Sequence, residues 1–385
     1  MRIGIDIRCL EGQKKTGVEE YTINLLKNLF ELDQKNEYVL FFNALKGKKL
    51  ELDWISKYPN VEIKSFRYPN KLFNLFVWYF NWPRIDQLIG GVDIFWMPNI
   101  NFGAFSKNTK LILTIHDLSF EIMPDNFPWK TRLWHFLINP KKLCRRADKI
   151  ITVSNSTKND LEIFYKINSQ KITAIHSAVS GEFGIIDRNN MRLLEIKDEY
   201  NLPYNFILYL GTIEPRKNIT GIIKAYNQIR KLKNPELDKY RLVIAGAKGW
   251  KEKGIKKEIE KSPFQSDIMT LGFIEAENKP YLYNLASLFV YPSFLEGFGF
   301  PPLEAMNSGV PVITSNNSAL PEIVGDAGIL IDPEKPDELF KAMREMLSNK
   351  DLRNNLREKG LRRAEKFNWN ISAEKFLEMI DTMSM

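Results

Sequence analysis

The first half of the chain alternates short apolar runs with amphipathic segments. The apolar runs predict strands at residues 3–7, 38–42, 61–66, 94–97, 111–115, 150–153 and 172–175. A helical repeat of apolar positions over residues 18–30 predicts a helix, and helical segments fit most of the other gaps. Because apolar strands alternate with helices, the pattern predicts an α/β fold with a doubly wound, mostly parallel sheet.

The second half repeats this alternation. Its apolar runs predict strands at residues 207–210, 242–245, 268–271, 288–291, 312–314 and 329–331, with a helix at 339–347 among those between them. Residues 180–203 are polar and weakly patterned, so we expect the domain boundary there. Two Rossmann-like domains at residues 1–185 and 200–366 would face a central cleft, with the ligand at the carboxyl ends of the strands. The simplest role for the helical pattern in residues 367–385 is to cap the second domain.

The composition is that of an ordinary globular protein in a reducing compartment. The 385 residues exceed what one core usually supports, and 44% are hydrophobic while 26% are charged. Cys9 and Cys144 are too few for a disulfide framework, and no ligand spacing suggests a structural zinc site. No segment resembles a signal peptide or a membrane span. We therefore expect a cytoplasmic protein of two domains.

The positive charge is concentrated in the first half of the chain. Residues 1–185 contain 26 Lys and Arg against 19 Asp and Glu, so they supply seven of the eight net positive charges. This excess favours an anionic partner, either nucleic acid or an acidic membrane surface. The aromatic run at residues 71–82 is most simply explained by core packing, with an interfacial or lipid contact as the alternative. The basic cluster at residues 141–149 is either a solvated helix face or a membrane contact.

The most informative stretch is LFVYPSFLEGFGFPPLEAMNSG, residues 288–309. An apolar strand leads into a glycine- and aromatic-rich turn, and Pro301 and Pro302 suit the start of a helix. The amino end of a helix binds phosphate, and Glu296 and Glu304 could accept hydrogen bonds from hydroxyl groups. The stretch therefore predicts a site for a phosphorylated, hydroxyl-rich ligand such as a nucleotide sugar.

Three further positions are candidates at strand ends. Arg216 and Lys217 follow the first strand of the second half, where two cations suit a diphosphate, although a solvated charge pair is the usual alternative. His116 ends an apolar strand and is either a structural histidine or a cleft residue. Residues 12–17, GQKKTG, end at Gly17 before the first helix and form either a ligand-facing turn or a plain surface turn. This segment lacks the Lys-Ser/Thr of a nucleoside-triphosphate loop.

Together these motifs resemble the retaining family-4 glycosyltransferases of the GT-B fold over almost the whole chain. The matching segments are GVEEYTINLL, TIHDL around His116, TVSNSTKNDL, GTIEPRKN and EGFGFPPLE, in the expected order. The last of these resembles the paired-glutamate element of that family. The resemblance implies a metal-independent glycosyltransferase, in accord with the absence of any Asp-x-Asp pair, and a terminal helix around Trp369 that crosses back to the first domain.

The resemblance also implies roles for the site residues. Glu296 would contact hydroxyls of the transferred sugar, and Glu304 would contact the ribose. The nucleotide sugar would otherwise be bound by Gly17, Thr212, Arg216, Lys217, Gly272, Phe273, Gly297, Phe298 and Gly299, with His116 beside the sugar. Many family members have Gly-Arg where this chain has Gly211-Thr212, so Arg216 would replace the missing cation.

The substrates follow from the same resemblance. The version of the motif with Thr212 and with Arg216-Lys217-Asn218 resembles the one in mannosyltransferases of bacterial surface polysaccharides. This similarity makes GDP-mannose the expected nucleotide sugar. The expected acceptor is a glycan or a lipid-linked saccharide, and the expected chemistry needs no cofactor. Peripheral contact with an anionic membrane is expected through the basic first half, and nucleic acid is not an expected partner. Two alternatives stay open: another nucleotide-sugar enzyme (hydrolase, epimerase or phosphorylase), or a non-catalytic basic protein that binds anions or membranes.

Overall fold

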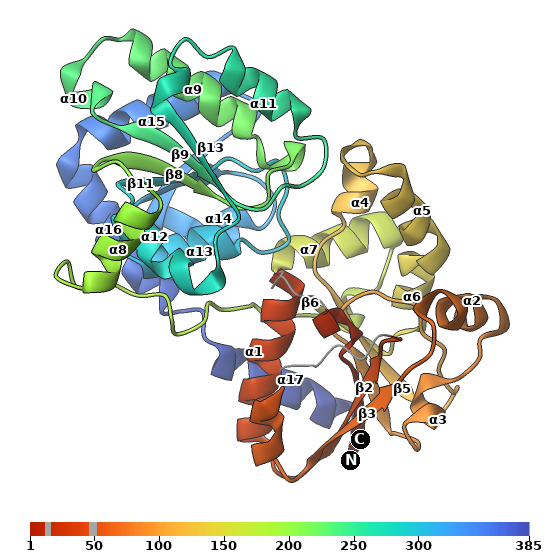
Figure 1. Ribbon diagram of the computed structural model, residues 1–385. Helices are drawn as coiled ribbons and strands as arrows, with labels where there is room; N and C mark the ends of the chain where they lie inside the picture. Colours follow the sequence, from red (N-terminus) through yellow and green to blue (C-terminus); the bar gives the residue numbers. More distant parts are fainter. Residues whose placement is uncertain (12–16, 46–51, 385) are drawn as a thin grey trace. The chain divides into compact units, whose positions relative to one another are not determined.

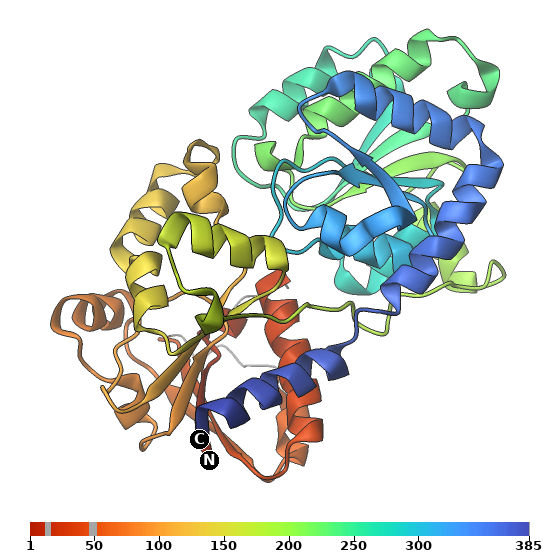
Figure 2. The same ribbon diagram turned by 180° about the vertical axis from the view of Figure 1, so that it is seen from behind.

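The computed structural model describes residues 1–11, 17–45 and 52–384. The chain divides into two compact units, which are shown in Figures 1 and 2. The first unit comprises Met1–Ile122, Trp129–Ser177 and Asn368–Met385. The second comprises Met123–Pro128 and Ala178–Phe367.

The first unit is built on a seven-stranded parallel sheet, counted over the described residues, with the order β3-β2-β1-β4-β5-β6-β7. Its strands are β1 (Arg2–Asp6), β2 (Glu37–Asn43), β3 (Val61–Phe66), β4 (Ile94–Met97), β5 (Lys110–Ile115), β6 (Lys149–Thr152) and β7 (Ile172–Ala174). Its helices are α1 (Gly17–Leu32), α2 (Asn70–Phe80), α3 (Ile85–Leu88), α4 (Ser119–Ile122), α5 (Trp129–Ile138), α6 (Pro140–Arg146), α7 (Asn155–Asp160) and α17 (Trp369–Ser384). Figure 1 shows α1 and α17 on one face of this sheet and α2, α5 and α6 on the other.

The second unit contains a six-stranded parallel sheet with the order β10-β9-β8-β11-β12-β13. Its strands are β8 (Phe206–Leu210), β9 (Arg241–Ala245), β10 (Ile268–Gly272), β11 (Leu288–Tyr291), β12 (Val312–Ser315) and β13 (Gly328–Ile331). Its helices are α8 (Met191–Glu199), α9 (Ile219–Lys231), α10 (Pro235–Asp238), α11 (Lys253–Glu260), α12 (Lys279–Leu285), α13 (Phe300–Asn307), α14 (Leu320–Val324), α15 (Pro336–Ser348) and α16 (Lys350–Ala364).

The predicted α/β class with two doubly wound parallel sheets is confirmed. Every predicted strand is present, and its ends lie within one residue of the expected ones. The strands were recognisable because both faces of a parallel sheet are covered, which requires continuous apolar runs. Strand β8, for example, is buried along its whole length.

Residues 180–203, where we expected the boundary, lie in the second unit, whose main segment begins at Ala178. Two side-chain contacts attach this segment to the second unit. The Ile186 backbone N–H donates to Asn284 Oδ1 at 2.9 Å, and Arg192 of α8 donates to Asn278 Oδ1 at 3.0 Å. The division between the units therefore falls at Ser177, just before this segment begins.

The terminal helix α17 belongs to the first unit, so the simple interpretation of a cap on the second domain is wrong. It packs along α1 (Figure 2). The Ser372 hydroxyl donates to the His176 carbonyl oxygen at 2.6 Å, and the Phe376 ring lies 4.6 Å from that of Trp96. The crossover that the family resemblance implied is thus present. In the described part of the chain, no helix combines the length and apolar composition needed to cross a membrane.

Candidate functional site

The carboxyl ends of the central strands of the second sheet meet at one edge. Backbone hydrogen bonds continue there beyond the strands, from the Gly211 N–H to the Ala245 carbonyl at 3.0 Å and from the Gly246 N–H to the Gly272 carbonyl at 2.6 Å. The turns after β8, β9 and β10 are therefore held side by side. This edge is where ligands bind in open α/β sheets.

Gly246 permits this close approach, and sequence reasoning missed it. Its φ is +140°, a conformation that residues with a side chain rarely adopt. A Cβ atom at this position would lie 1.8 Å from the carbonyl oxygen of Gly211, which is backbone and has little freedom to move away. Only glycine fits between the two turns.

We expect Gly246→Ala to lower the free energy of unfolding by about 3 kcal/mol, because overpacking adds to backbone strain. Gly254→Ala is the matched control: it adds the same methyl group on α11, where nothing lies within 4 Å. The control should change stability by less than about 1 kcal/mol. Urea unfolding of the two variants tests this, and equal effects would contradict the steric argument.

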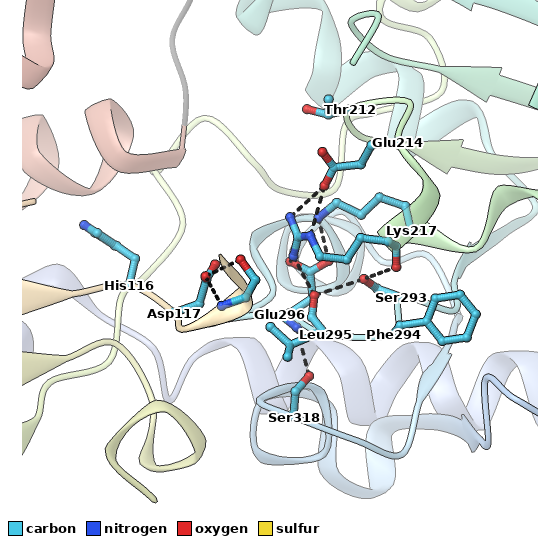
Figure 3. A network of polar contacts seen from close by, with 12 residues as sticks. His116, Asp117, Thr212, Glu214, Lys217, Ser293, Phe294, Leu295, Glu296 and Ser318 are labelled. Atoms are coloured by element: carbon cyan, nitrogen blue, oxygen red, sulfur yellow. Dashed lines mark hydrogen bonds and ion pairs between the residues drawn. The ribbon is translucent and has the colours of Figure 1, made fainter. Parts of the chain in front are cut away.

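Lys217 is the centre of the polar network that Figure 3 shows. It lies in the 3-10 turn Pro215–Lys217 after β8 and is buried. Its Nζ donates to Glu296 Oε1 at 2.5 Å and to the Tyr291 hydroxyl at 2.8 Å. Since Tyr291 ends β11 and Glu296 follows it, this lysine ties the turns after β8 and β11 together.

Arg216 bridges two carboxylates in the same network. Its Nη2 lies 2.8 Å from Glu214 Oε1, and its Nη1 lies 3.4 Å from Glu296 Oε2. Nη1 also donates to the Leu295 carbonyl oxygen at 2.5 Å. Glu214 is almost fully buried and was not among the predicted site residues. Two cations and two carboxylates thus alternate at this edge of the sheet.

The charges of this network change the acidity of its members. Burial acts to raise the pKa of Glu296, but the positive charges of Lys217 and Arg216 outweigh it, together with hydrogen bonds from Lys217 and Ser293, and lower the pKa to about 2. Burial and the neighbouring Arg216 lower the pKa of Lys217, against the attraction of Glu296. Glu296 is therefore an ionised hydrogen-bond acceptor at neutral pH and does not serve as a proton donor.

The turn that carries Glu296 is anchored from several sides. The Phe294 N–H donates to the Arg216 carbonyl at 2.8 Å, and the Glu296 N–H donates to Ser318 Oγ at 2.9 Å. Gly299, with φ at +123°, ends the turn immediately before α13. Pro301 and Pro302 lie in the first turn of α13, as predicted.

Glu304 lies further along α13 and is buried. Its Oε2 accepts a hydrogen bond from the Tyr283 hydroxyl at 2.7 Å, which holds the carboxylate against α12. Glu296 and Glu304 therefore differ in surroundings, because Glu296 contacts two cations and Glu304 contacts a phenol. In the part of the chain that the structure describes, no three His, Cys, Asp or Glu side chains gather as metal ligands.

Comparisons with known proteins identify the family of the chain. A family model described as glycosyltransferase family 4 matches residues 15–183, and one described as glycosyl transferases group 1 matches residues 194–363. O-antigen chain mannosyltransferase B of Escherichia coli is 30% identical over 367 residues, covering 92% of this chain and 93% of the relative. The chain belongs to glycosyltransferase family 4.

Two further comparisons place this glycosyltransferase among its relatives. Serotype-specific mannosyltransferase WbdA of Escherichia coli is 32% identical over 272 residues, which cover 70% of this chain but 33% of that relative. The structure of sucrose-phosphate synthase from Thermosynechococcus elongatus superimposes with a TM-score of 0.74 at 18% identity, covering 99% of this chain and 98% of that one. This likeness confirms the GT-B fold.

Other predicted residues of the glycosyltransferase lie at the same edge of the second sheet. Thr212 is exposed, and its carbonyl accepts a hydrogen bond from the Tyr209 hydroxyl at 2.9 Å. Gly272 ends β10 with φ at +76°, and the Phe273 side chain that follows is 39% exposed. Thr212 therefore follows β8, and Gly272 and Phe273 lie at the end of β10, in the sheet whose strands β8 and β11 precede Lys217 and the turn of residues 296–299.

Gly17 and His116 belong to the first unit, and their roles toward the sugar stay predictions. His116 follows β5, where its Nε2 lies 2.8 Å from the Pro98 carbonyl, and its ring meets that of Tyr21 edge to face. Burial lowers the pKa of His116, partly opposed by this carbonyl, so the imidazole is neutral near pH 7. Gly17 is exposed and begins α1, whereas residues 12–16 lie outside the described residues.

The first unit also contains a buried ion pair that we did not predict. Asp6 ends β1, and its Oδ2 lies 2.5 Å from Arg8 Nη2. The Arg8 guanidinium also lies over the rings of Phe41 and Phe73. A charged residue in an apolar strand is costly to bury alone. The presence of Asp6 in this strand could therefore have predicted a nearby residue of opposite charge.

Proposed function

We propose that this glycosyltransferase transfers mannose from GDP-mannose to a hydroxyl group of a glycan or lipid-linked saccharide, with retention of configuration, during surface polysaccharide synthesis. The observation that carries the proposal is the buried Lys217–Glu296 pair at the carboxyl ends of β8 and β11. The names of its relatives, O-antigen chain mannosyltransferase B and WbdA, support mannose and this class of acceptor.

Each charged group has a distinct task in this proposal. When the bond between the anomeric carbon and the phosphate oxygen breaks, negative charge grows on the diphosphate, and Lys217 stabilises it. Glu296, ionised because of its low pKa, accepts hydrogen bonds from hydroxyls of the sugar. Glu304 does the same for the ribose. The acceptor oxygen attacks on the face that the phosphate leaves, and its proton moves to a phosphate oxygen.

Arg216 contributes in a different way from the cation that many family members carry at the position of Thr212. Its guanidinium is engaged by Glu214 and by the Leu295 carbonyl, so it holds the turn before Glu296 in place. Its charge still adds to the positive potential beside Lys217. In this proposal Glu214 is a positioning residue that fixes the orientation of Arg216.

A panel of nucleotide sugars tests the proposal. GDP-mannose should raise the melting temperature of the protein more than UDP-glucose or ADP-glucose, because a ligand at 100 times its Kd adds about 2.7 kcal/mol of stability. Proton NMR of the transferred sugar should then show the anomeric configuration of GDP-mannose. A larger shift with UDP- or ADP-glucose would contradict GDP-mannose, and no shift with any of them would contradict nucleotide-sugar transfer.

A further inference from the structure

Helix α2 is apolar around most of its circumference although it lies on the surface of the first unit. Phe73 and Val77 pack into the core, which is one side of the helix. Apart from Lys71, most of the side chains that point outward are also apolar, and Tyr79 is 70% exposed. The exposed set is Leu72, Leu75, Phe76, Trp78, Tyr79 and Phe80, followed by Trp82. Helices that are apolar all round are typical of buried or membrane environments, so the outer side of α2 is unusual for a water-facing surface. The expectation that residues 71–82 pack in the core is wrong for most of them.

Helix α5 carries a second exposed apolar stripe. Trp129, Leu133 and Phe136 are four and three residues apart, a spacing that aligns them on one side of a helix. They are 68%, 46% and 78% exposed, while Ile138 of the same helix is buried. The stripe is therefore the outer side of α5.

Both stripes belong to the same face of the first unit. The core cluster beneath that face contains Phe73 and Val77 of α2, Ile138 of α5 and Cys144 of α6. Figures 1 and 2 both show α2, α5 and α6 together on this side of the sheet. We call the outer sides of these three helices the aromatic–basic face.

The charge of this face is mostly positive, although Arg146 is paired with Asp148 just beyond α6. Residues 67–84 and 129–147 contain nine Lys and Arg and no Asp or Glu. The nine are Arg67, Lys71, Arg84, Lys130, Arg132, Lys141, Lys142, Arg145 and Arg146. Exposed tryptophan, tyrosine and leucine beside cations fit the interface of a bilayer, where rings enter the headgroup layer and cations meet anionic lipids. A nucleic acid would explain the cations but not the leucines at 72, 75 and 133.

We propose that the first unit docks on anionic lipid bilayers through the aromatic–basic face. The apolar stripes of α2 and α5 enter the headgroup layer, and the cations of α6 and of the flanking residues contact the lipid phosphates. This contact is independent of the proposed sugar transfer, because it involves no residue of the Lys217–Glu296 network.

Vesicle flotation of the full chain, without nucleotide sugar or acceptor, tests the proposal. The chain should float with vesicles of equal parts phosphatidylcholine and phosphatidylglycerol, and at least tenfold less should float with phosphatidylcholine alone, since each cation near an anionic surface contributes about a factor of five. Leu75→Ser/Trp78→Ser/Tyr79→Ser should lower binding at least tenfold. Its matched control is Met191→Ser/Leu194→Ser/Tyr204→Ser, which removes three exposed apolar side chains from the second unit and should bind as the native chain does.

The charges are tested separately. Lys71→Gln/Lys142→Gln/Arg145→Gln should lower binding by about 100-fold at low salt, and raising the salt should reduce that difference. Lys253→Gln/Lys257→Gln/Lys261→Gln changes the net charge equally on the second unit and should leave binding unchanged.

Several outcomes would overturn the proposal. One is failure of the native chain to float with anionic vesicles, and another is unchanged binding of the triple serine variant. A third is a native dimer, measured by light scattering, that the serine substitutions dissociate, because the face would then be covered by a second copy. Transfer to a water-soluble acceptor should be unchanged in the serine variant, so a failure of docking remains distinct from a failure of the transfer assay.

Discussion

Replacing Lys217 with alanine is expected to lower the turnover of sugar transfer by about 1,000-fold, the usual cost of losing one preorganised charge at a site of developing negative charge. The buried ammonium lies 2.5 Å from Glu296 and 2.8 Å from the Tyr291 hydroxyl. Its position is therefore set before the substrate arrives. Alanine removes both the charge and this preset geometry.

The loss should appear in turnover more than in binding of the nucleotide sugar, because the diphosphate gains charge as the glycosidic bond breaks. The matched control is Lys224→Ala, since Lys224 is exposed on α9 in the same unit. Steady-state kinetics with the preferred nucleotide sugar measure both variants. Lys217→Arg keeps the charge but has a planar fork in place of a compact ammonium, so we expect it to restore only part of the activity.

Near-native turnover of Lys217→Ala would show that this lysine has no role in the reaction. A rise in KM alone would assign Lys217 to ground-state binding and would contradict the role in stabilising the leaving diphosphate. Thermal unfolding of the same preparations separates either result from loss of the fold.

The strands and the general position of the site could be predicted because both depend on local sequence. Continuous apolar runs mark strands buried on both faces. The sequence of residues 288–309 predicts a strand, a turn and a helix in that order. The partners across the site could not be predicted in the same way. Lys217 and Glu296 are 79 residues apart, and the parallel order β8-β11 brings them together.

The buried carboxylate at Glu214 shows a second limit of sequence reasoning. A glutamate two residues before an arginine is common on solvated surfaces, where such pairs contribute little. Here both side chains are largely buried, so each requires a charged partner. Burial depends on the whole sheet edge and is not visible in the local pattern GTIEPRKN.

The aromatic segment at residues 71–82 also shows that burial cannot be predicted from local sequence, because most of its apolar side chains are exposed. Hydrophobicity identifies side chains that avoid water, but it does not say what covers them. Phe73 and Val77 are covered by the core, whereas Trp78 and Tyr79 lie on the other side of α2 and are exposed. The side that faces the core is decided by how the helix packs on the sheet.

Acid should destabilise the native protein more than a variant that lacks the Glu296 carboxylate. The folded pKa of Glu296 is about 2, below its ordinary value of 4.5. A lowered pKa means that the ionised form stabilises the fold above pH 4.5 and that this contribution is lost as the pH falls toward 2. The difference corresponds to about 3 kcal/mol at 1.36 kcal/mol per pKa unit.

Urea unfolding of the native chain and of Glu296→Gln between pH 6 and pH 2 measures this contribution. The glutamine variant keeps the size of the side chain and an oxygen that accepts from Lys217, but it cannot titrate. The native chain should therefore lose about 3 kcal/mol more than the variant over this range. Glu260→Gln removes an exposed carboxylate from α11 and should follow the native curve. Parallel curves for the native chain and Glu296→Gln would show that the buried pair does not lower the pKa of Glu296, and the assignment of an ionised sugar-binding carboxylate would then lose its electrostatic basis.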